Sequence, residues 1–157
     1  MYRVTREIHF CYGHRLLNHD GKCRHLHGHN GKAVITLASD CLDPLGMVMD
    51  FTRIKRVVSS WIDEALDHKM LLHRDDPMLP LLRQQGEPVY VMDVNPTAEN
   101  IARLIYDFTS QQGFPIVEVQ LWETDHCYAT YQGENGLGFA PEDPTARAKR
   151  KRDARST

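Results

Sequence analysis

The chain has 157 residues, of which 41% are hydrophobic and 25% charged, and its formal net charge is −2 at pH 7. This length predicts one domain with one core, and the composition is that of a globular protein. The sequence contains no run of about 18 apolar residues, the length that a membrane-spanning helix needs, so we expect no membrane partner.

The first ten residues, MYRVTREIHF, carry charges where a secretory signal has its apolar segment, so we expect a cytoplasmic protein. No C-x-x-C spacing is present, and in a reducing compartment we expect free thiols rather than a disulfide framework. The cysteines are Cys11, Cys23, Cys41 and Cys127.

The C-terminal segment differs from the rest of the chain in charge. Residues 141–157 hold six Lys or Arg against three acids. This composition favours a solvated, disordered tail that follows a single domain at residues 1–140. Alternatively, the run RAKRKRDAR would bind nucleic acid or another anionic partner.

The first half of the chain shows two periodicities. Alternating apolar and polar residues at 2–10 predict a strand, and GKAVITLAS predicts a second strand directly after a cluster of histidines. The spacing of apolar residues then changes to three and four, which predicts an amphipathic helix over 50–67 with Asp50 as its N-cap. A polar stretch with several prolines, 73–96, is expected to be a loop with a short extended piece near 89–92.

The second half predicts one more helix and two more strands. The helix follows Thr97 as N-cap and ends before Gly113, and the strands lie in PIVEVQLWE and CYATYQ. This order predicts an α+β fold: a four-stranded, mostly antiparallel sheet with two helices on one face. Because no further element covers the other face and the edges of the sheet, we expect self-assembly.

Three histidines are candidate metal ligands. His27 and His29 are two apart on a predicted strand and project from the same side, and His14 lies just past the first strand on the parity of its apolar residues. Three imidazoles with an open fourth position describe catalytic Zn²⁺, whereas a structural site has four ligands. The alternative is that exposed histidines in a polar hairpin bind nothing.

Other side chains are candidates for proton transfer and ligand binding. Cys23 lies in a basic setting that favours a thiolate, and it serves either as base or nucleophile or as a fourth zinc ligand. Asp67 and His68 form a carboxylate-imidazole pair suited to carrying a proton, or only a solvated helix end. Glu123 ends a strand on its core-facing parity and would accept two hydrogen bonds from a planar, N–H-rich heterocycle, unless it bends back to water.

Together these segments closely resemble the family of 6-pyruvoyl tetrahydropterin and 6-carboxytetrahydropterin synthases. The resemblance runs from Tyr2 to Tyr131, and the compact NPTAEN and LHGH context is similar to the bacterial queuosine branch of the family. The matching motifs are F-x-x-x-H-R-L at Phe10 to Leu16, C-x-x-x-H-G-H at Cys23 to His29, GMVMDF at Gly46 to Phe51, LDH at Leu66 to His68, NPTAEN at Asn95 to Asn100, and ET-x-x-x-x-A-x-Y at Glu123 to Tyr131.

The resemblance implies a role for each candidate residue. Zinc would be held by His14, His27 and His29; protons would be handled by Cys23, Asp67 and His68; and the pterin would be anchored by Glu123 and Thr97. It also implies the T-fold, in which three chains form a barrel and two trimers form a hexamer, with active sites between subunits. The implied reaction converts 7,8-dihydroneopterin triphosphate to 6-carboxy-5,6,7,8-tetrahydropterin, releasing acetaldehyde and triphosphate.

The chain departs from the family pattern at several positions. Tyr12 stands where a small residue is common before the first zinc histidine, and Leu72 stands where an asparagine is common. Arg24 replaces the usual glycine after Cys23 and is followed by His25, which adds charge. These departures leave the product open, so 6-pyruvoyltetrahydropterin synthesis without side-chain cleavage stays an alternative. A zinc-stabilised module that binds nucleic acid through the basic tail is an alternative of another class, although no nucleic-acid partner is expected.

Overall fold

A computed structural model describes residues 1–134 of the chain. The predicted basic tail at 141–157 and the last residues of the predicted domain lie outside this range. Within it, no helix is long and apolar enough to cross a membrane. The elements follow in the order β1 (Tyr2–His14), a 3₁₀ turn (Lys22–Arg24), β2 (His27–Ser39), α1 (Phe51–Ile54), a π-helical turn (Lys55–Ser59), α2 (Ser60–Ala65), β3 (Lys69–His73), α3 (Met78–Gln84), β4 (Val89–Met92), α4 (Ala98–Gln111), β5 (Ile116–Thr124) and β6 (Cys127–Tyr131).

The six strands form one sheet in the order β4-β3-β1-β2-β5-β6. The long strands β1 and β2 pair antiparallel along their whole length, from Tyr2 opposite Ser39 to His14 opposite His27. β5 and β6 continue the antiparallel pairing beyond β2. This confirms the predicted α+β fold and its four antiparallel strands, and it extends the first strand to include His14.

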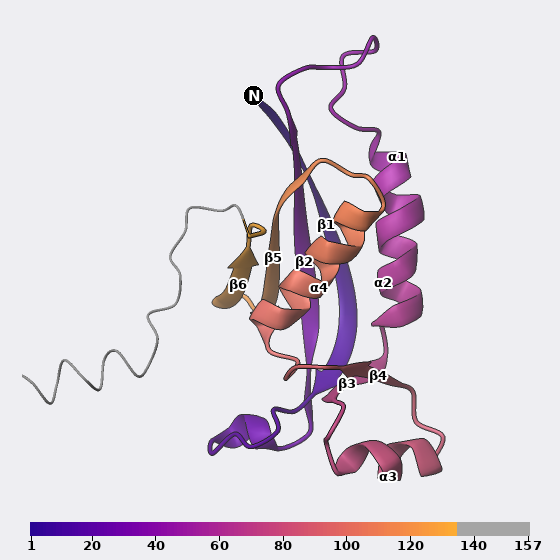
Figure 1. Ribbon diagram of the computed structural model, residues 1–157, viewed down its shortest axis with the longest axis vertical. Coiled ribbons are helices and arrows are strands. Elements are labelled where there is room, and N and C mark those ends of the chain that lie inside the picture. The colour runs from indigo at the N-terminus through magenta and orange to yellow at the C-terminus, as the bar shows by residue number, and fades with distance from the viewer. Residues whose placement is uncertain (135–157) are drawn as a thin grey trace, which may run out of the picture.

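The helices cover one face of this sheet, as predicted. Figure 1 shows α1 and α2 in line with each other and α4 beside them, in front of the long strands. The ring of Trp61 in α2 stacks on the ring of Phe108 in α4, with centroids 4.0 Å apart, so the two helices pack directly on each other. The core between helices and sheet is formed by the buried side chains Ile8, Phe10, Ala33, Ile35, Leu37, Ile54, Val58, Ile62, Leu66, Ile101, Ile105, Val119 and Leu121.

Both predicted N-caps form. The Asp50 carboxylate accepts a hydrogen bond from the Thr52 N–H at 2.8 Å, and the Thr97 hydroxyl accepts one from the Asn100 N–H at 3.3 Å. Each cap satisfies a backbone donor that the first helical turn leaves without a partner. At the other end of α4, Gly113 has a φ of 75°, the left-handed conformation that ends a helix most easily at glycine.

The opposite face of the sheet is polar. Hydrogen bonds or ion pairs on it join Thr5 to Thr36, Lys32 to Glu7, and Gln120 to Glu118. Such a face tolerates water, so the expectation that it must be covered by another surface does not follow from its chemistry. The edge of β1 that faces away from β2 is different. Only three residues of β1 pair with β3 along this edge, namely Tyr12, Gly13 and His14.

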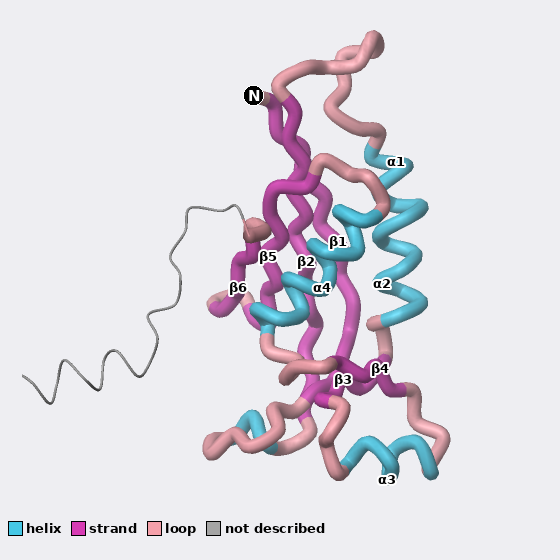
Figure 2. Tube along the Cα trace, viewed as in Figure 1, coloured by secondary structure: helices cyan, strands magenta, loops and turns pink. Residues whose placement is uncertain are grey.

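One strand, β3, and one helix, α3, were not predicted, and β4 was predicted only as a short extended piece. β3 and β4 run parallel to each other and to β1, and Figure 2 shows them crossing one end of the sheet next to α3. The range 89–92 was predicted as extended, but β3 is a five-residue strand without alternation. Pro80 in α3 suggested a loop, yet it lies in the first turn, where the missing N–H removes no helical hydrogen bond.

Candidate metal centre and active site

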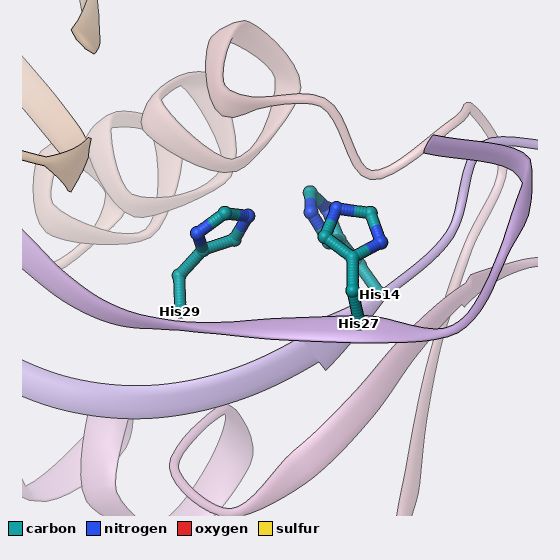
Figure 3. A group of neighbouring side chains, drawn as sticks. All are labelled: His14, His27 and His29. Carbon is teal, nitrogen blue, oxygen red and sulfur yellow. The ribbon is translucent and has the colours of Figure 1, made fainter. Parts of the chain in front are cut away.

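The three predicted histidines meet at the end of the β1–β2 pair. His14 lies opposite His27, and Tyr12 lies opposite His29, so all three imidazoles occupy neighbouring positions on one face. Figure 3 shows the rings projecting from the same side of the two strands. Their centroids are 4.5 to 5.2 Å apart, and one nitrogen from each lies within 4.8 Å of the others.

The hydrogen bonds of these rings leave nitrogens free for a metal. Nδ1 of His14 bonds to the Pro96 carbonyl at 2.7 Å, and Nδ1 of His27 bonds to the His25 carbonyl at 2.8 Å. A carbonyl only accepts, so both Nδ1 atoms carry the proton and both Nε2 atoms present a lone pair. Nε2 of His14 is buried without a hydrogen-bond partner within the described range. The donor set and the orphaned nitrogen therefore fit a bound divalent cation such as Zn²⁺.

Burial keeps His14 neutral. The residue is 3% exposed, and this burial lowers the pKa of His14 below its ordinary value, although the hydrogen bond to Pro96 and the charge of Glu123 oppose the shift. A neutral imidazole is the form that binds metal.

A carboxylate lies beside the histidines. Oε1 of Glu123 is 3.7 Å from Nε2 of His14 and 3.9 Å from Nε2 of His29, and it accepts a hydrogen bond from the Tyr12 hydroxyl at 3.1 Å. Burial, followed by the charge and the hydrogen bond of Glu123, raises the pKa of Tyr12 well above its ordinary value. The hydroxyl therefore stays protonated and donates. Glu123 thus faces the three-histidine cluster, on the side that its strand parity predicted.

Asp67 and His68 form a pair that is anchored to β1. Oδ2 of Asp67 lies 2.6 Å from Nδ1 of His68, while Oδ1 accepts the Cys11 N–H at 2.7 Å. The His68 N–H donates to the Cys11 carbonyl, which holds His68 at a φ of 55°. Burial alone would raise the pKa of Asp67, but the hydrogen bonds from Cys11 and His68 outweigh it and lower that pKa.

Cys23 belongs to another segment of the chain, the turn between β1 and β2. It is half-buried in the 3₁₀ turn, and its carbonyl accepts the Leu16 N–H at 2.8 Å. Within residues 1–134 no hydrogen bond joins Cys23 to Asp67 or His68, and none of the three belongs to the group of ligand atoms formed by the histidines. One chain therefore brings the three histidines and Glu123 together and holds Asp67 with His68, while no hydrogen bond within residues 1–134 joins the Cys23 side chain to either group.

Several supporting residues were missed from the sequence. Arg15 donates two hydrogen bonds, both 2.7 Å, to the buried carboxylate of Asp76, which also accepts the Met78 N–H at the start of α3. This ion pair ties the end of β1 to α3. No periodicity marks it, because the partners are far apart in the chain.

The NPTAEN segment supports the site through its side chains. The Asn95 amide exchanges hydrogen bonds with the N–H and the carbonyl of Leu17, and Pro96 follows with the carbonyl that binds His14. Thr97 then caps α4. The segment therefore fixes both the loop after β1 and the first metal-ligand candidate, which explains its place beside the histidines.

The fold and the site define a class of protein: an α+β T-fold with a three-histidine centre at the end of a strand pair. Residues 3–134 match the family model described as 6-pyruvoyl tetrahydropterin synthase. The chain belongs to this family.

Relatives and solved structures agree. The chain is 40% identical over 136 residues to the 6-carboxy-5,6,7,8-tetrahydropterin synthase of Rickettsia conorii, a match covering 82% of this chain and 98% of the relative. An uncharacterized protein from Wolinella succinogenes has a similar structure, with a TM-score of 0.71 at 29% identity, covering 85% of this chain and 98% of that one. The 6-pyruvoyl tetrahydropterin synthase of Caenorhabditis elegans aligns with a TM-score of 0.63 at 26% identity, covering 84% and 95%.

Proposed function

We propose that this protein is a lyase that converts 7,8-dihydroneopterin triphosphate to 6-carboxy-5,6,7,8-tetrahydropterin, with release of acetaldehyde and triphosphate. The observation that carries the proposal is the three-histidine centre beside Glu123 in a chain 40% identical to a synthase of that name. This is the reaction of the queuosine pathway, and we propose that it takes place in the cytoplasm.

The metal is proposed to be Zn²⁺, held by His14, His27 and His29. When bound, it would act as a Lewis acid that makes a carbon-bound hydrogen beside a coordinated oxygen more acidic. The chain contributes the orientation of the ligands, because the carbonyls of Pro96 and His25 fix two of the rings.

The pterin ring is proposed to bind at Glu123. Oε2 of this carboxylate makes no hydrogen bond within residues 1–134, and the side chain is 23% exposed. A carboxylate so placed can accept N–H groups from a planar heterocycle. Thr97 and its backbone neighbours are proposed to support the same ring, although the Thr97 hydroxyl also caps α4.

Proton transfer is proposed for Cys23, Asp67 and His68. The Cys23 thiolate would remove a proton from the substrate, and His68, oriented by Asp67, would carry one. His68 is suited to this because its side chain is 79% exposed while Nδ1 is held at 2.6 Å from the carboxylate. Since one chain does not join Cys23 to the pair, we propose that the active site forms between subunits of a trimer or hexamer.

The same site supports a second product. If the side chain is not cleaved after triphosphate leaves, the product is 6-pyruvoyltetrahydropterin, the activity named for the Caenorhabditis elegans protein with the same fold. The cleaving reaction is favoured here by the 40% identity to the Rickettsia conorii synthase.

The test is turnover of 7,8-dihydroneopterin triphosphate by zinc-loaded protein, with triphosphate, acetaldehyde and pterin mass measured together. We expect equal amounts of triphosphate and acetaldehyde. Cys23→Ala should keep its zinc and lose at least ~100-fold in kcat, the scale of positioned acid-base catalysis. Triphosphate without acetaldehyde would assign the second product, and loss of zinc from the variant would make Cys23 a metal ligand.

A further inference from the structure

We infer that Tyr12 is a positioning residue that fixes the Glu123 carboxylate at the edge of the metal centre and keeps it from becoming a fourth metal ligand. The part of this inference that concerns the ligand rests on the proposed role of Glu123 as pterin anchor. The part that concerns the metal does not.

The ring of Tyr12 is held in a space made by a glycine. A Cβ at Gly31 would lie 2.7 Å from Cε1 of Tyr12, so only glycine leaves room for the ring there. The ring also stacks on Phe10, with centroids 5.3 Å apart and an interplanar angle of 25°. Tyr12 is 3% exposed, and this packing leaves the hydroxyl one direction to point.

The Tyr12 hydroxyl points to Glu123. This residue lies on β5, two strands away from β1 in the sheet. The oxygen that accepts the hydroxyl is Oε1, the same atom that lies 3.7 and 3.9 Å from Nε2 of His14 and His29. Ligands at 2.0–2.2 Å from a tetrahedral zinc are roughly 3.3–3.6 Å from one another. Oε1 lies slightly farther than this from two of the histidines, and Glu123 does not belong to the group of ligand atoms that the three histidines form.

The hydrogen bond from the Tyr12 hydroxyl determines whether the Glu123 carboxylate would bind the metal or remain available for a heterocycle. A hydroxyl that donates to a carboxylate oxygen makes that oxygen a poorer metal ligand and holds it in place. Oε2 then stays available for a bound heterocycle. Without the hydroxyl, Oε1 would lose this hydrogen-bond donor, and its lone pair would be free to bind the metal and close the open coordination position.

The test compares Tyr12→Phe with wild type in zinc affinity, measured by chelator competition on full-length protein. Phenylalanine keeps the ring in the Gly31 space and removes only the hydroxyl. We expect zinc to bind about 10-fold more tightly, since the net effect of one hydrogen bond to a charged group is on that scale. The matched control is Tyr106→Phe, which removes a hydroxyl bonded to the Ile116 carbonyl away from the metal centre and should leave zinc affinity unchanged.

Glu123→Ala makes the test independent of any packing change at Tyr12. If Tyr12 holds the carboxylate off the metal, Glu123→Ala binds zinc as wild type does, and adding Tyr12→Phe to it changes nothing further. Zinc affinity that is unchanged or weaker in Tyr12→Phe, or that falls in Glu123→Ala, overturns the inference.

The ligand part is measured separately, by fluorescence titration with neopterin. We expect Tyr12→Phe to bind neopterin about 10-fold more weakly than wild type, since the carboxylate is drawn to the metal. If wild type neither binds neopterin nor turns over the triphosphate, the proposed function fails. The zinc measurements would still decide whether Tyr12 restrains Glu123.

Discussion

Individual residues in this site act through their neighbours. The Pro96 carbonyl fixes the tautomer of His14, and the Tyr12 hydroxyl fixes Glu123. The residue types themselves were predictable, because histidines two apart on a strand converge on one side. Tyr12 was recognised only as a departure from the family pattern, since a tyrosine before a histidine carries no local signal of its hydrogen bond to a glutamate 111 residues away.

At the scale of single residues, the contribution of the Asp67 carboxylate to stability can be tested through its pH dependence. Its pKa is lower in the folded protein than in the unfolded chain, so between the two values the unfolded chain binds more protons. The stabilisation is complete above the ordinary carboxyl pKa of about 4 and is lost as the pH falls through the folded value. We expect Asp67→Asn to lower the free energy of unfolding by about 1 kcal/mol at pH 7 and by progressively less as the pH falls from 4 through the folded pKa of Asp67. Urea unfolding at pH 7 and at a series of pH values below 4 measures this, and a difference that stays constant down to the lowest pH would contradict it.

At the scale of elements, the periodicity of apolar residues was sufficient to predict a strand or helix wherever one of its faces is buried. The two long strands, the helices after Asp50 and Thr97, and the last two strands follow from alternation or from spacings of three and four. β3 and β4 were harder to predict because they are short and complete the sheet by parallel pairing with distant partners. The site depends on both kinds of element, since Asp67 and His68 directly precede β3.

Two glycines that face each other in the β1–β2 pair should differ in their tolerance of a side chain. A Cβ at Gly28 would lie 2.9 Å from the Tyr12 carbonyl oxygen, which is backbone and cannot move without separating the strands. A Cβ at Gly13 meets the end of the Met70 side chain, which can turn away. We expect Gly28→Ala to destabilise the protein by about 1–3 kcal/mol and Gly13→Ala by less. Thermal unfolding of the two variants checks this, and an equal or larger loss in Gly13→Ala would refute it.

At the scale of the whole molecule, assembly is the feature that the sequence indicates least directly. Self-assembly was expected partly because the second face of the sheet seemed uncovered, but that face is polar and hydrogen-bonded. A second reason is chemical: one chain holds the three histidines in one place, and within residues 1–134 no hydrogen bond joins Cys23 to the Asp67–His68 pair. We therefore propose that a second chain completes an active site that uses all of them.

Mixed assemblies test this arrangement. Cys23→Ala and His68→Ala are each expected to be inactive alone. If each site takes Cys23 from one subunit and His68 from another, random co-assembly of the two variants returns about one quarter of wild-type turnover, because that share of sites receives both native residues. Turnover of a co-expressed, co-purified mixture measures it. A mixture as inactive as its components would place both residues in the same chain's site.

Strand β1 contributes both side chains and backbone groups to the site, and this has a further consequence. The side chains of Tyr12 and His14 lie on the face of the three-histidine cluster, while the backbone of Cys11 forms hydrogen bonds with Asp67 and His68. An insertion or deletion of one amino acid between Tyr12 and His14 would reverse the side of the sheet that His14 faces relative to Cys11. The His14 imidazole would then turn to the polar face, away from His27 and His29, so we expect this short stretch to tolerate exchanges of residues better than a change of length.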